Sequence, residues 1–203
     1  MRNSPVVAAA ALLLTVAANP ASAQDALAQR AKGSPTAPVT VFEMSDFQCP
    51  YCRRFAIETF PELDRDYVKT GKVRWVFVNF PLPRHSNATP AAEVAMCAGR
   101  QGAFWPVHDL LFKYQDTWSP LASPAEFFLS LADSARIDRK VLASCLESGA
   151  AREEVKSDAQ GAVRSGANST PTFYIEGGLL AGAHPAGVFR PILDSIIAAR
   201  SKK

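Results

Sequence analysis

Two cysteines separated by two residues are the strongest chemical signal in this sequence. The segment reads Cys49-Pro50-Tyr51-Cys52 and follows a β-rich run, and proline is favoured at the first position of a helix. Cys49 would then face the unpaired backbone N–H groups and the positive end of the helix dipole, which favour a thiolate. Cys52 would lie one turn further in, without that exposure. The pattern predicts a redox pair in which Cys49 exchanges with substrate and Cys52 resolves the mixed disulfide.

Three other uses of these cysteines compete with redox exchange. A structural zinc site would need Cys97 and Cys145 as further ligands, but those two lie far apart and form no second close pair. Haem attachment requires a histidine after the second cysteine, where this sequence has Arg53. A purely structural disulfide between Cys49 and Cys52 would close almost no loop and would stabilise the fold little. Redox exchange is therefore the interpretation that we favour.

Residues 1–23 predict a secretory signal peptide. Arg2 supplies a positive charge, an apolar run follows, and Ala21-Ser22-Ala23 is an A-x-A cleavage site. The apolar run is about 13 residues long, short of the roughly 20 that cross a bilayer, and an uncleaved anchor is the alternative. We expect export to the periplasm, where disulfides persist.

The composition is that of an ordinary globular protein. The chain has 203 residues, of which 48% are hydrophobic and 20% charged, and this excludes wholesale disorder and fibrous repeats. A formal net charge of +3 is too weak and too evenly spread for a nucleic-acid binder. The length allows one sizeable domain or two small ones.

The elements that must position the cysteines follow from the residue pattern. Residues 24–38 are rich in Ala, Gly, Ser and Pro and predict a flexible lead-in. A strand over 39–44, a helix from Pro50 to about Thr70 with a kink at Pro61, and a strand over 73–80 predict a βαβ unit with parallel strands. The later elements are a helical block over 87–164, a strand over 172–176, a turn at Gly177-Gly178, a return strand over 179–181 and a helix over 188–199.

Several of these segments resemble one known family. Residues 41–52 resemble the active-site segment of DsbA-like thiol-disulfide oxidoreductases, which are exported members of the thioredoxin superfamily. Ser169-Thr170-Pro171-Thr172-Phe173 resembles the cis-proline loop of that superfamily, and residues 97–109 resemble the helical insertion of one DsbA-like subgroup. The resemblance covers about residues 37–197. It implies an α/β, thioredoxin-like fold over 39–203 with a helical domain inserted at about 84–168.

The resemblance also implies roles for individual residues. Pro171 matches the cis-proline that lies across from Cys49 and helps to hold an extended substrate strand, and Thr170 matches the preceding position, which tunes Cys49. Glu43 matches a buried acid that assists proton transfer from Cys52, although the residue pattern alone equally allows a carboxylate at a strand edge facing water.

The second pair of cysteines has two interpretations. Cys97 and Cys145 could be buried free thiols that pack as small hydrophobic side chains. The resemblance to the subgroup instead implies a structural disulfide between them, which clamps the helical block.

One departure from the family concerns the residue between the active-site cysteines. The best-known strong oxidants carry histidine where this sequence has Tyr51, which predicts a reduction potential nearer to that of thioredoxin. Among the histidines, we expect His85 at the rim of the active-site face and His108 packed within the helical block. The aromatic residues Phe47, Tyr51 and Phe173 are either an apolar collar for unfolded chains or ordinary packing.

Together these features predict an enzyme that donates disulfides to unfolded or reduced exported proteins. A membrane reoxidase of the DsbB type would restore the oxidised form, an expectation that rests on the resemblance alone. We expect a monomer with no metal, no organic cofactor and no nucleic-acid partner. The alternatives are a disulfide reductase or isomerase on the same fold, and a carrier that binds Cu(I) through Cys49 and Cys52.

Overall fold

The computed structural model describes residues 27–201 of the chain. The predicted signal peptide and the first part of the predicted lead-in lie outside these residues. In the described part of the chain, no helix combines the length and the apolar character that crossing a membrane requires.

Five strands form one mixed sheet that carries the active-site loop. The strands are β1 (Ala31–Lys32), β2 (Val39–Ser45), β3 (Val73–Asn79), β4 (Thr172–Ile175) and β5 (Gly178–Ala181), in the spatial order β1-β3-β2-β4-β5. Strands β2 and β3 are parallel, as the predicted βαβ unit requires, and the other three pairs are antiparallel. The central strand β2 is therefore flanked by other strands on both sides, and its C-terminal end leads into the loop that carries the two cysteines.

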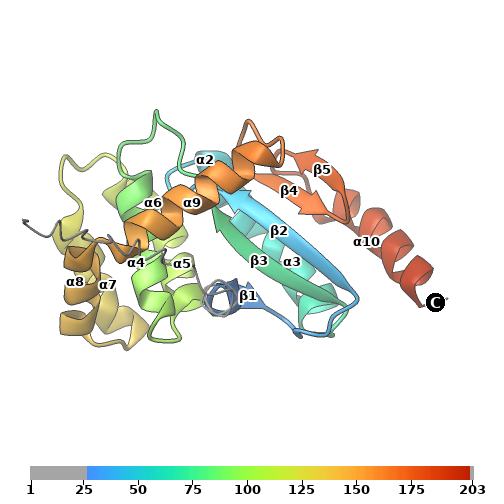
Figure 1. Cartoon of the computed structure of the whole chain (residues 1–203), viewed down its shortest axis with the longest axis horizontal. Helices are drawn as coiled ribbons and strands as arrows, with labels where there is room; N and C mark the ends of the chain where they lie inside the picture. The colour runs from blue at the N-terminus through green and yellow to red at the C-terminus, as the bar shows by residue number, and fades with distance from the viewer. Residues whose placement is uncertain (1–26, 202–203) are drawn as a thin grey trace, which may run out of the picture.

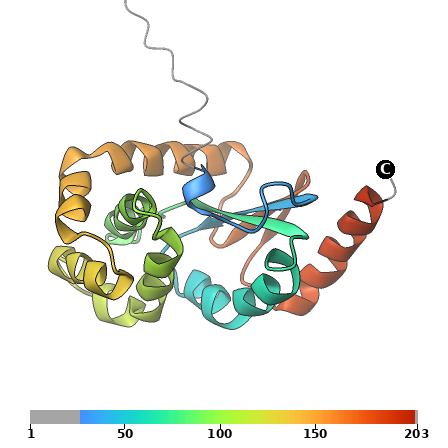
Figure 2. The same ribbon diagram turned by 90° about the horizontal axis from the view of Figure 1, so that it is seen from below.

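Helices cover both faces of the sheet and form a separate block beside it. The helical elements are α2 (Pro50–Arg54), η1 (Phe55–Thr59), α3 (Phe60–Leu63), η2 (Asp64–Val68), α4 (Ala88–Gly99), α5 (Phe104–Lys113), α6 (Gln115–Trp118), α7 (Ala125–Ala135), α8 (Arg139–Ser148), α9 (Ala150–Arg164) and α10 (Ala186–Arg200). Helices α4 to α8 gather on one side of the sheet, and α9 runs back from them toward α2 (Figure 1). Figure 2 shows the sheet between α9 on one side and the α2–η2 helix and α10 on the other. This arrangement agrees with the predicted thioredoxin-like fold with a helical insertion.

The helix predicted to begin at Pro50 is continuous, but two of its turns are π-helical. The first of them, η1, ends immediately before the turn that contains Pro61, and the N–H of Phe60 bonds to the carbonyl of Phe55. Proline lacks the N–H that an α-helical turn would use, and a π turn is a common way to absorb such a fault. The expected disturbance at Pro61 is therefore a widening of the turn before it.

The predicted flexible lead-in at 24–38 is wrong for its middle part. Ala31–Lys32 pairs antiparallel with β3 as an edge strand. The adjacent Arg30 is buried and forms an ion pair with Asp158 of α9, with a second contact of 2.8 Å from its Nη2 to Oδ1. The same carboxylate accepts a 2.8 Å hydrogen bond from the side chain of Asn79. These partners lie far along the chain, so the local composition could not reveal them.

The predicted turn at Gly177-Gly178 is displaced by one residue. The two turn residues are Glu176 and Gly177, both with positive φ (47° and 92°), and Gly178 is the first residue of β5. A two-residue hairpin loop matches the twist of its strands when both central residues have positive φ. Glu176 therefore adopts the left-handed conformation that glycine usually supplies, and its carboxylate pairs with Arg200.

One apolar core extends from the sheet into the helical block, and aromatic rings fill much of it. Phe47 stacks on Phe77 with ring centroids 4.8 Å apart, and it also contacts Phe112 of α5. His108 packs edge-on against Phe77 at 5.3 Å and is buried, which confirms that it is a packed histidine. The inserted block is thus not a loosely attached domain, because its rings share the core beneath the active-site loop.

Candidate active site

The N-terminus of α2 holds the two active-site cysteines. Cys49 is the residue before the helix, with extended backbone angles, and Pro50 begins the helix. Both Cys49 and Cys52 are buried free thiols. The backbone N–H of Asp46 points to Sγ of Cys52 at 3.5 Å, so the loop folds back over the second sulfur.

The surroundings of Cys49 stabilise its thiolate. A hydrogen bond donated by the thiol of Cys52 lowers the pKa of Cys49, burial opposes this, and donors on Thr170 and the backbone N–H groups of Cys52 and Tyr51 lower it further. The resulting pKa is about 6. Because the backbone donors belong to the first turn of α2, the predicted contribution of the helix N-terminus is present. At pH 7 a thiol with this pKa is roughly 90% ionised.

The thiol of Cys52 ionises much less readily than that of Cys49. Burial raises the pKa of Cys52 well above the ordinary value of 9.0, and the hydrogen bond to Cys49 and the negative charge of the Cys49 thiolate raise it further. Contacts with Ser45 and the backbone of Asp46 lower it only in part. Two thiols three residues apart therefore differ sharply in how readily they ionise.

The loop that precedes β4 brings Thr170 and Pro171 against the first cysteine. The Thr170–Pro171 peptide bond is cis. The sulfur of Cys49 lies 3.5 Å from the carbonyl oxygen of Thr170, across 121 residues of sequence. The hydroxyl of Thr170 is buried and has no partner within the described residues while Cys49 is a thiol. It is thus available as a donor when the thiolate forms, in accord with its effect on the pKa.

Glu43 lies inside the protein, and the alternative of a water-facing strand-edge carboxylate is wrong. Its Oε2 accepts a 2.8 Å hydrogen bond from Nε1 of Trp75, and the residue is buried in the face of β2 that packs on the helices. Burial raises the pKa of Glu43, while the nearby His108 and hydrogen bonds from Trp75 and Ser45 lower it in part. Ser45 lowers the pKa of both Glu43 and Cys52, so the acid and the second thiol share this neighbour.

Sequence reasoning missed Asp46, whose buried carboxylate organises the loop before Cys49. Its Oδ1 accepts a 2.7 Å hydrogen bond from the N–H of Gln48, and its Oδ2 accepts one of 2.8 Å from the N–H of Leu82. Nδ1 of His85 lies 2.7 Å from the same Oδ2. The predicted position of His85 at the active-site face is thus correct, and its partner is Asp46.

Two side-chain amides, those of Gln115 and Gln48, join the inserted block to the active-site loop. Nε2 of Gln115 donates to the carbonyls of Phe47 and Cys49, at 2.6 and 3.1 Å. Oε1 of Gln48 accepts from the N–H of Asn87 at 2.7 Å, and Gln48 also donates to the carbonyl of Ser119. Polar residues of this kind give no periodic signal, so the sequence alone does not distinguish them from other surface residues.

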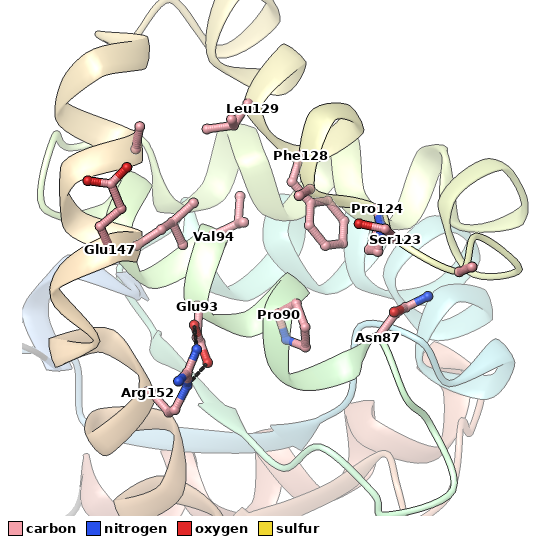
Figure 3. A pocket seen from close by; sticks show the side chains of 14 residues that line it. Asn87, Pro90, Glu93, Val94, Ser123, Pro124, Phe128, Leu129, Glu147 and Arg152 are labelled. Atoms are coloured by element: carbon pink, nitrogen blue, oxygen red, sulfur yellow. Dashed lines mark hydrogen bonds and ion pairs between the residues drawn. The ribbon is translucent and has the colours of Figure 1, made fainter.

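A cavity of about 450 Å³ lies within the helical block next to Asn87 (Figure 3). Its lining is mostly apolar, and an ion pair between Glu93 and Arg152, 2.8 Å from Oε1 to Nε, closes one side. The lining includes neither Cys49 nor Cys52. The cavity therefore lies next to Asn87, which bonds to Gln48 of the active-site loop, and does not reach the thiols.

The aromatic residues around the loop do not form a collar. Phe47 and Phe173 are fully buried in the core, so the packing interpretation holds for both. Tyr51 is 58% exposed, and the guanidinium of Arg54 lies 5.2 Å from its ring. Of the three, only Tyr51 can meet a partner at the surface.

Cys97 of α4 and Cys145 of α8 are joined by a disulfide in the structure. The bridge spans a sequence separation of 48 residues within the helical block. Within residues 27–201, there is no group of three or more His, Cys, Asp or Glu side chains that could hold a metal ion.

A thiol pair at a helix N-terminus, set beside a cis-proline loop on this sheet, defines the class of thioredoxin-like thiol-disulfide oxidoreductases. The model of the family described as Thioredoxin matches residues 25–195, and the chain belongs to that family. The resemblance to DsbA-like proteins is thereby confirmed.

Similar proteins fall into two groups by length. The probable disulfide bond formation protein D of Bacillus anthracis is 30% identical over 154 residues, which cover 74% of this chain and 71% of that protein. The Na(+)/H(+) antiporter NhaA 3 of Salinispora tropica is 37% identical over 147 residues, 72% of this chain, but this chain spans only about a fifth (21%) of the antiporter's length. The crystal structure of oxidised BdbD from Bacillus subtilis superposes with a TM-score of 0.76 at 24% identity, covering 84% of this chain and 93% of that chain, and so shares the fold.

Proposed function

We propose that this protein donates disulfides to reduced exported polypeptides through the Cys49–Cys52 pair. The observation that carries the proposal is the asymmetry of the two thiols. The pKa of Cys49 is about 6, and that of Cys52 is raised well above 9.0. A stabilised thiolate favours the reduced protein, and a protein whose reduced form is stabilised gives up its disulfide readily.

The reaction begins with the oxidised Cys49–Cys52 bond. A substrate thiolate attacks Sγ of Cys49, a mixed disulfide forms, and Cys52 leaves and takes up one proton. A second substrate thiolate then attacks the substrate sulfur of the mixed disulfide, and Cys49 leaves as a thiolate. Two electrons pass from the substrate dithiol to the protein, and the substrate leaves with one disulfide.

Glu43 is the proposed proton donor to Cys52. Because burial raises the pKa of Glu43, its carboxyl group holds a proton more readily than an exposed glutamate does. The protonated carboxyl can neutralise the sulfur that leaves in the first step and accept the proton again in the reverse reaction.

Thr170 and Pro171 are proposed to hold the substrate backbone. The carbonyl of Thr170 lies beside Cys49, at the point where the loop enters β4. An extended peptide can pair with such a segment in the manner of an added strand. This places the substrate sulfur next to Cys49.

The cellular setting belongs to the proposal as well. Export through a cleaved signal peptide at 1–23, action as a monomer in the periplasm, and reoxidation by a membrane protein of the DsbB type are the expected context. The name of the relative from Bacillus anthracis, a probable disulfide bond formation protein, supports the same direction of exchange.

Tyr51 favours a second candidate function, that of a disulfide reductase or isomerase. The residue between the cysteines is exposed and uncharged, so a protonated histidine does not add to the stabilisation of the thiolate. The net direction then depends on the donors around Cys49 alone. A lower potential would make the same site a reductant.

Equilibration of the pair with glutathione buffers of known composition tests the proposal. We expect a potential less negative than the roughly −270 mV of thioredoxin, since the Cys49 pKa lies below the roughly 7 of thioredoxin. A potential at or below that of thioredoxin would favour the reductase. The Cys49→Ser variant is the control, because it should show no exchange at all.

A further inference from the structure

An open groove lies beside the active-site loop, on the side of α9. It has a volume of about 730 Å³ and is formed by the segment that follows β3 and by the last turns of α9 with the residues after them. Figure 1 shows the C-terminal end of α9 and the segment after β3 at the same end of the sheet as α2. The groove therefore lies at the end of the sheet that carries α2 and the active-site cysteines.

Two wall residues of the groove, Leu82 and Asn168, are linked closely to Cys49. Leu82, in one wall, donates its N–H to Asp46, and the N–H of Cys49 bonds to the carbonyl of Asp46 at 3.0 Å. Asn168, in the other wall, lies two residues before Thr170, whose carbonyl is 3.5 Å from the sulfur of Cys49. An extended chain advances about 3.3 Å per residue, so substrate residues roughly two to five positions from the reacting cysteine can reach the groove.

The floor of the groove is preformed and apolar. Phe80, Leu82 and Ala167 belong to a buried cluster that is separate from the main core, and Ala159 packs against it. Val163 stands at the edge with 61% of its surface exposed. Val163 extends this apolar floor to the surface, and a contiguous apolar patch of this kind is typical of a surface that a partner covers.

The rim of the groove is cationic. Lys156 and Arg164 of α9 line it, and the exposed Arg84 adjoins its wall at Pro83. Within the described residues, neither Arg84 nor Arg164 forms an ion pair, and Lys156 has only a 3.9 Å contact with Glu153. These charges are free to meet carboxylates of a partner.

We infer that this groove binds an extended apolar and acidic segment of the reduced polypeptide, next to the cysteine that reacts with Cys49. The apolar floor accepts the hydrophobic side chains, and Lys156 and Arg164 pair with the acidic ones. The inference rests on the proposed function and adds a preference for one class of substrate segment. It predicts that sequence around the substrate cysteine changes binding and leaves the chemistry at sulfur unchanged.

The test compares three reductants of the oxidised full-length protein. One is a peptide with a single cysteine flanked at two to five residues by Leu, Phe and Asp, the second has Lys in place of each Asp, and the third is glutathione, which is too short to reach the groove. The variants are Val163→Glu and Arg164→Glu. The matched control is Val141→Glu on α8, because Val141 is likewise an exposed valine (50%) but lies outside the groove.

We expect Val163→Glu and Arg164→Glu each to slow the reaction with the acidic peptide by about tenfold, through a higher KM. The first variant loses an apolar binding contact, and the second loses charge complementarity. Reaction with glutathione should stay the same, the lysine peptide should be slow with the wild-type protein, and Val141→Glu should change nothing. Equal rates for both peptides, or equal effects of Val163→Glu and Val141→Glu, would overturn the inference while leaving the proposed function intact. Failure of glutathione to reduce the Cys49–Cys52 bond would instead overturn the proposed function itself, and the inference with it.

Discussion

The side chain of Gln115 donates a 3.1 Å hydrogen bond to the backbone carbonyl of Cys49. Gln115 begins α6 in the inserted block, and the same Nε2 donates to the carbonyl of Phe47 at 2.6 Å. The reactive loop is thus held from both sides, by the helix that follows it and by the inserted block. The insertion is part of the active site and not only an appendage of the fold.

Replacement of Gln115 by Leu should destabilise the protein and loosen the loop. The carbonyl of Phe47 would lose its donor and the carbonyl of Cys49 would keep only the N–H of Arg53, at a cost of about 1–3 kcal/mol in the free energy of unfolding. Denaturant unfolding measures this, and alkylation of Cys49 reports the loop. Gln160→Leu, at an exposed position on α9, is the control and should cost little. A Gln115→Leu variant as stable as Gln160→Leu would contradict this account.

Substitution of each active-site cysteine should separate their roles. Cys49→Ser should abolish exchange, whereas Cys52→Ser should accumulate mixed disulfides at Cys49, because Cys52 can then no longer attack Cys49 and displace the bound substrate. Alkylation of the reduced wild-type protein between pH 6 and 7, followed by mass mapping, should label Cys49 first, since its pKa is about 6 and that of Cys52 is raised. Faster labelling of Cys52 would show that the assignment is reversed.

The Glu43→Gln variant should be more stable than the wild type at neutral pH. The pKa of Glu43 is raised above its ordinary value of 4.5 by burial, so the unfolded chain loses this proton at a lower pH than the folded protein. Stability contributed by the protonated carboxyl is complete below about 4.5 and is lost as pH rises through the folded pKa. Glutamine keeps an oxygen for Trp75 and carries no charge.

Unfolding of the two proteins at a series of pH values checks this prediction. The difference should be small at pH 4 and should grow as pH rises. The release of mixed disulfides by Cys52 should also slow by about tenfold or more in Glu43→Gln, as for loss of an acid–base group. Parallel pH profiles would mean that Glu43 has no shifted pKa, and an unchanged release rate would remove it from proton transfer.

Much of the core fold could be predicted because its signals are local. The β-rich run before Cys49, the proline after it and the apolar strand over 73–80 each lie within one segment, and together they fix a parallel βαβ unit. Cys49 and Cys52 could be selected for the same reason. The burial of Glu43 could not, because a single charged residue between two apolar neighbours fits either face of a strand.

The rest of the site depends on contacts between distant segments. Gln115 and Asp46 act through hydrogen bonds to backbone groups, which leave no periodic pattern in the sequence. The strand Ala31–Lys32 has only two residues, too few to show a β pattern, and its pairing with β3 decides its structure. For Phe47 and Phe173, the sequence does not show whether the ring lines a surface or fills the core.

The disulfide between Cys97 and Cys145 should stabilise the helical block. Closing a loop of 48 residues in the unfolded chain contributes about 4 kcal/mol in the loop-entropy model. The double variant Cys97→Ala, Cys145→Ala should therefore unfold at a lower denaturant concentration while Cys49 and Cys52 still exchange. Mass mapping of the unreduced protein should find the Cys97–Cys145 bridge, and two free thiols in protein recovered from the exported fraction would contradict it.

The unfolding free energies of the reduced and oxidised forms at pH 7 decide whether the protein is a disulfide donor. The Cys49 thiolate stabilises only the reduced form, and the disulfide, which closes a loop with only two residues between its cysteines, adds little to the oxidised form. With a pKa of about 6 against 9.0 for an ordinary thiol, this stabilisation is largest above pH 9, is still present at pH 7, and is lost as pH falls through 6. Reduced protein should be the more stable form at pH 7, and the difference should shrink toward pH 6. Oxidised protein clearly more stable at pH 7 would contradict the disulfide donor and support the reductase.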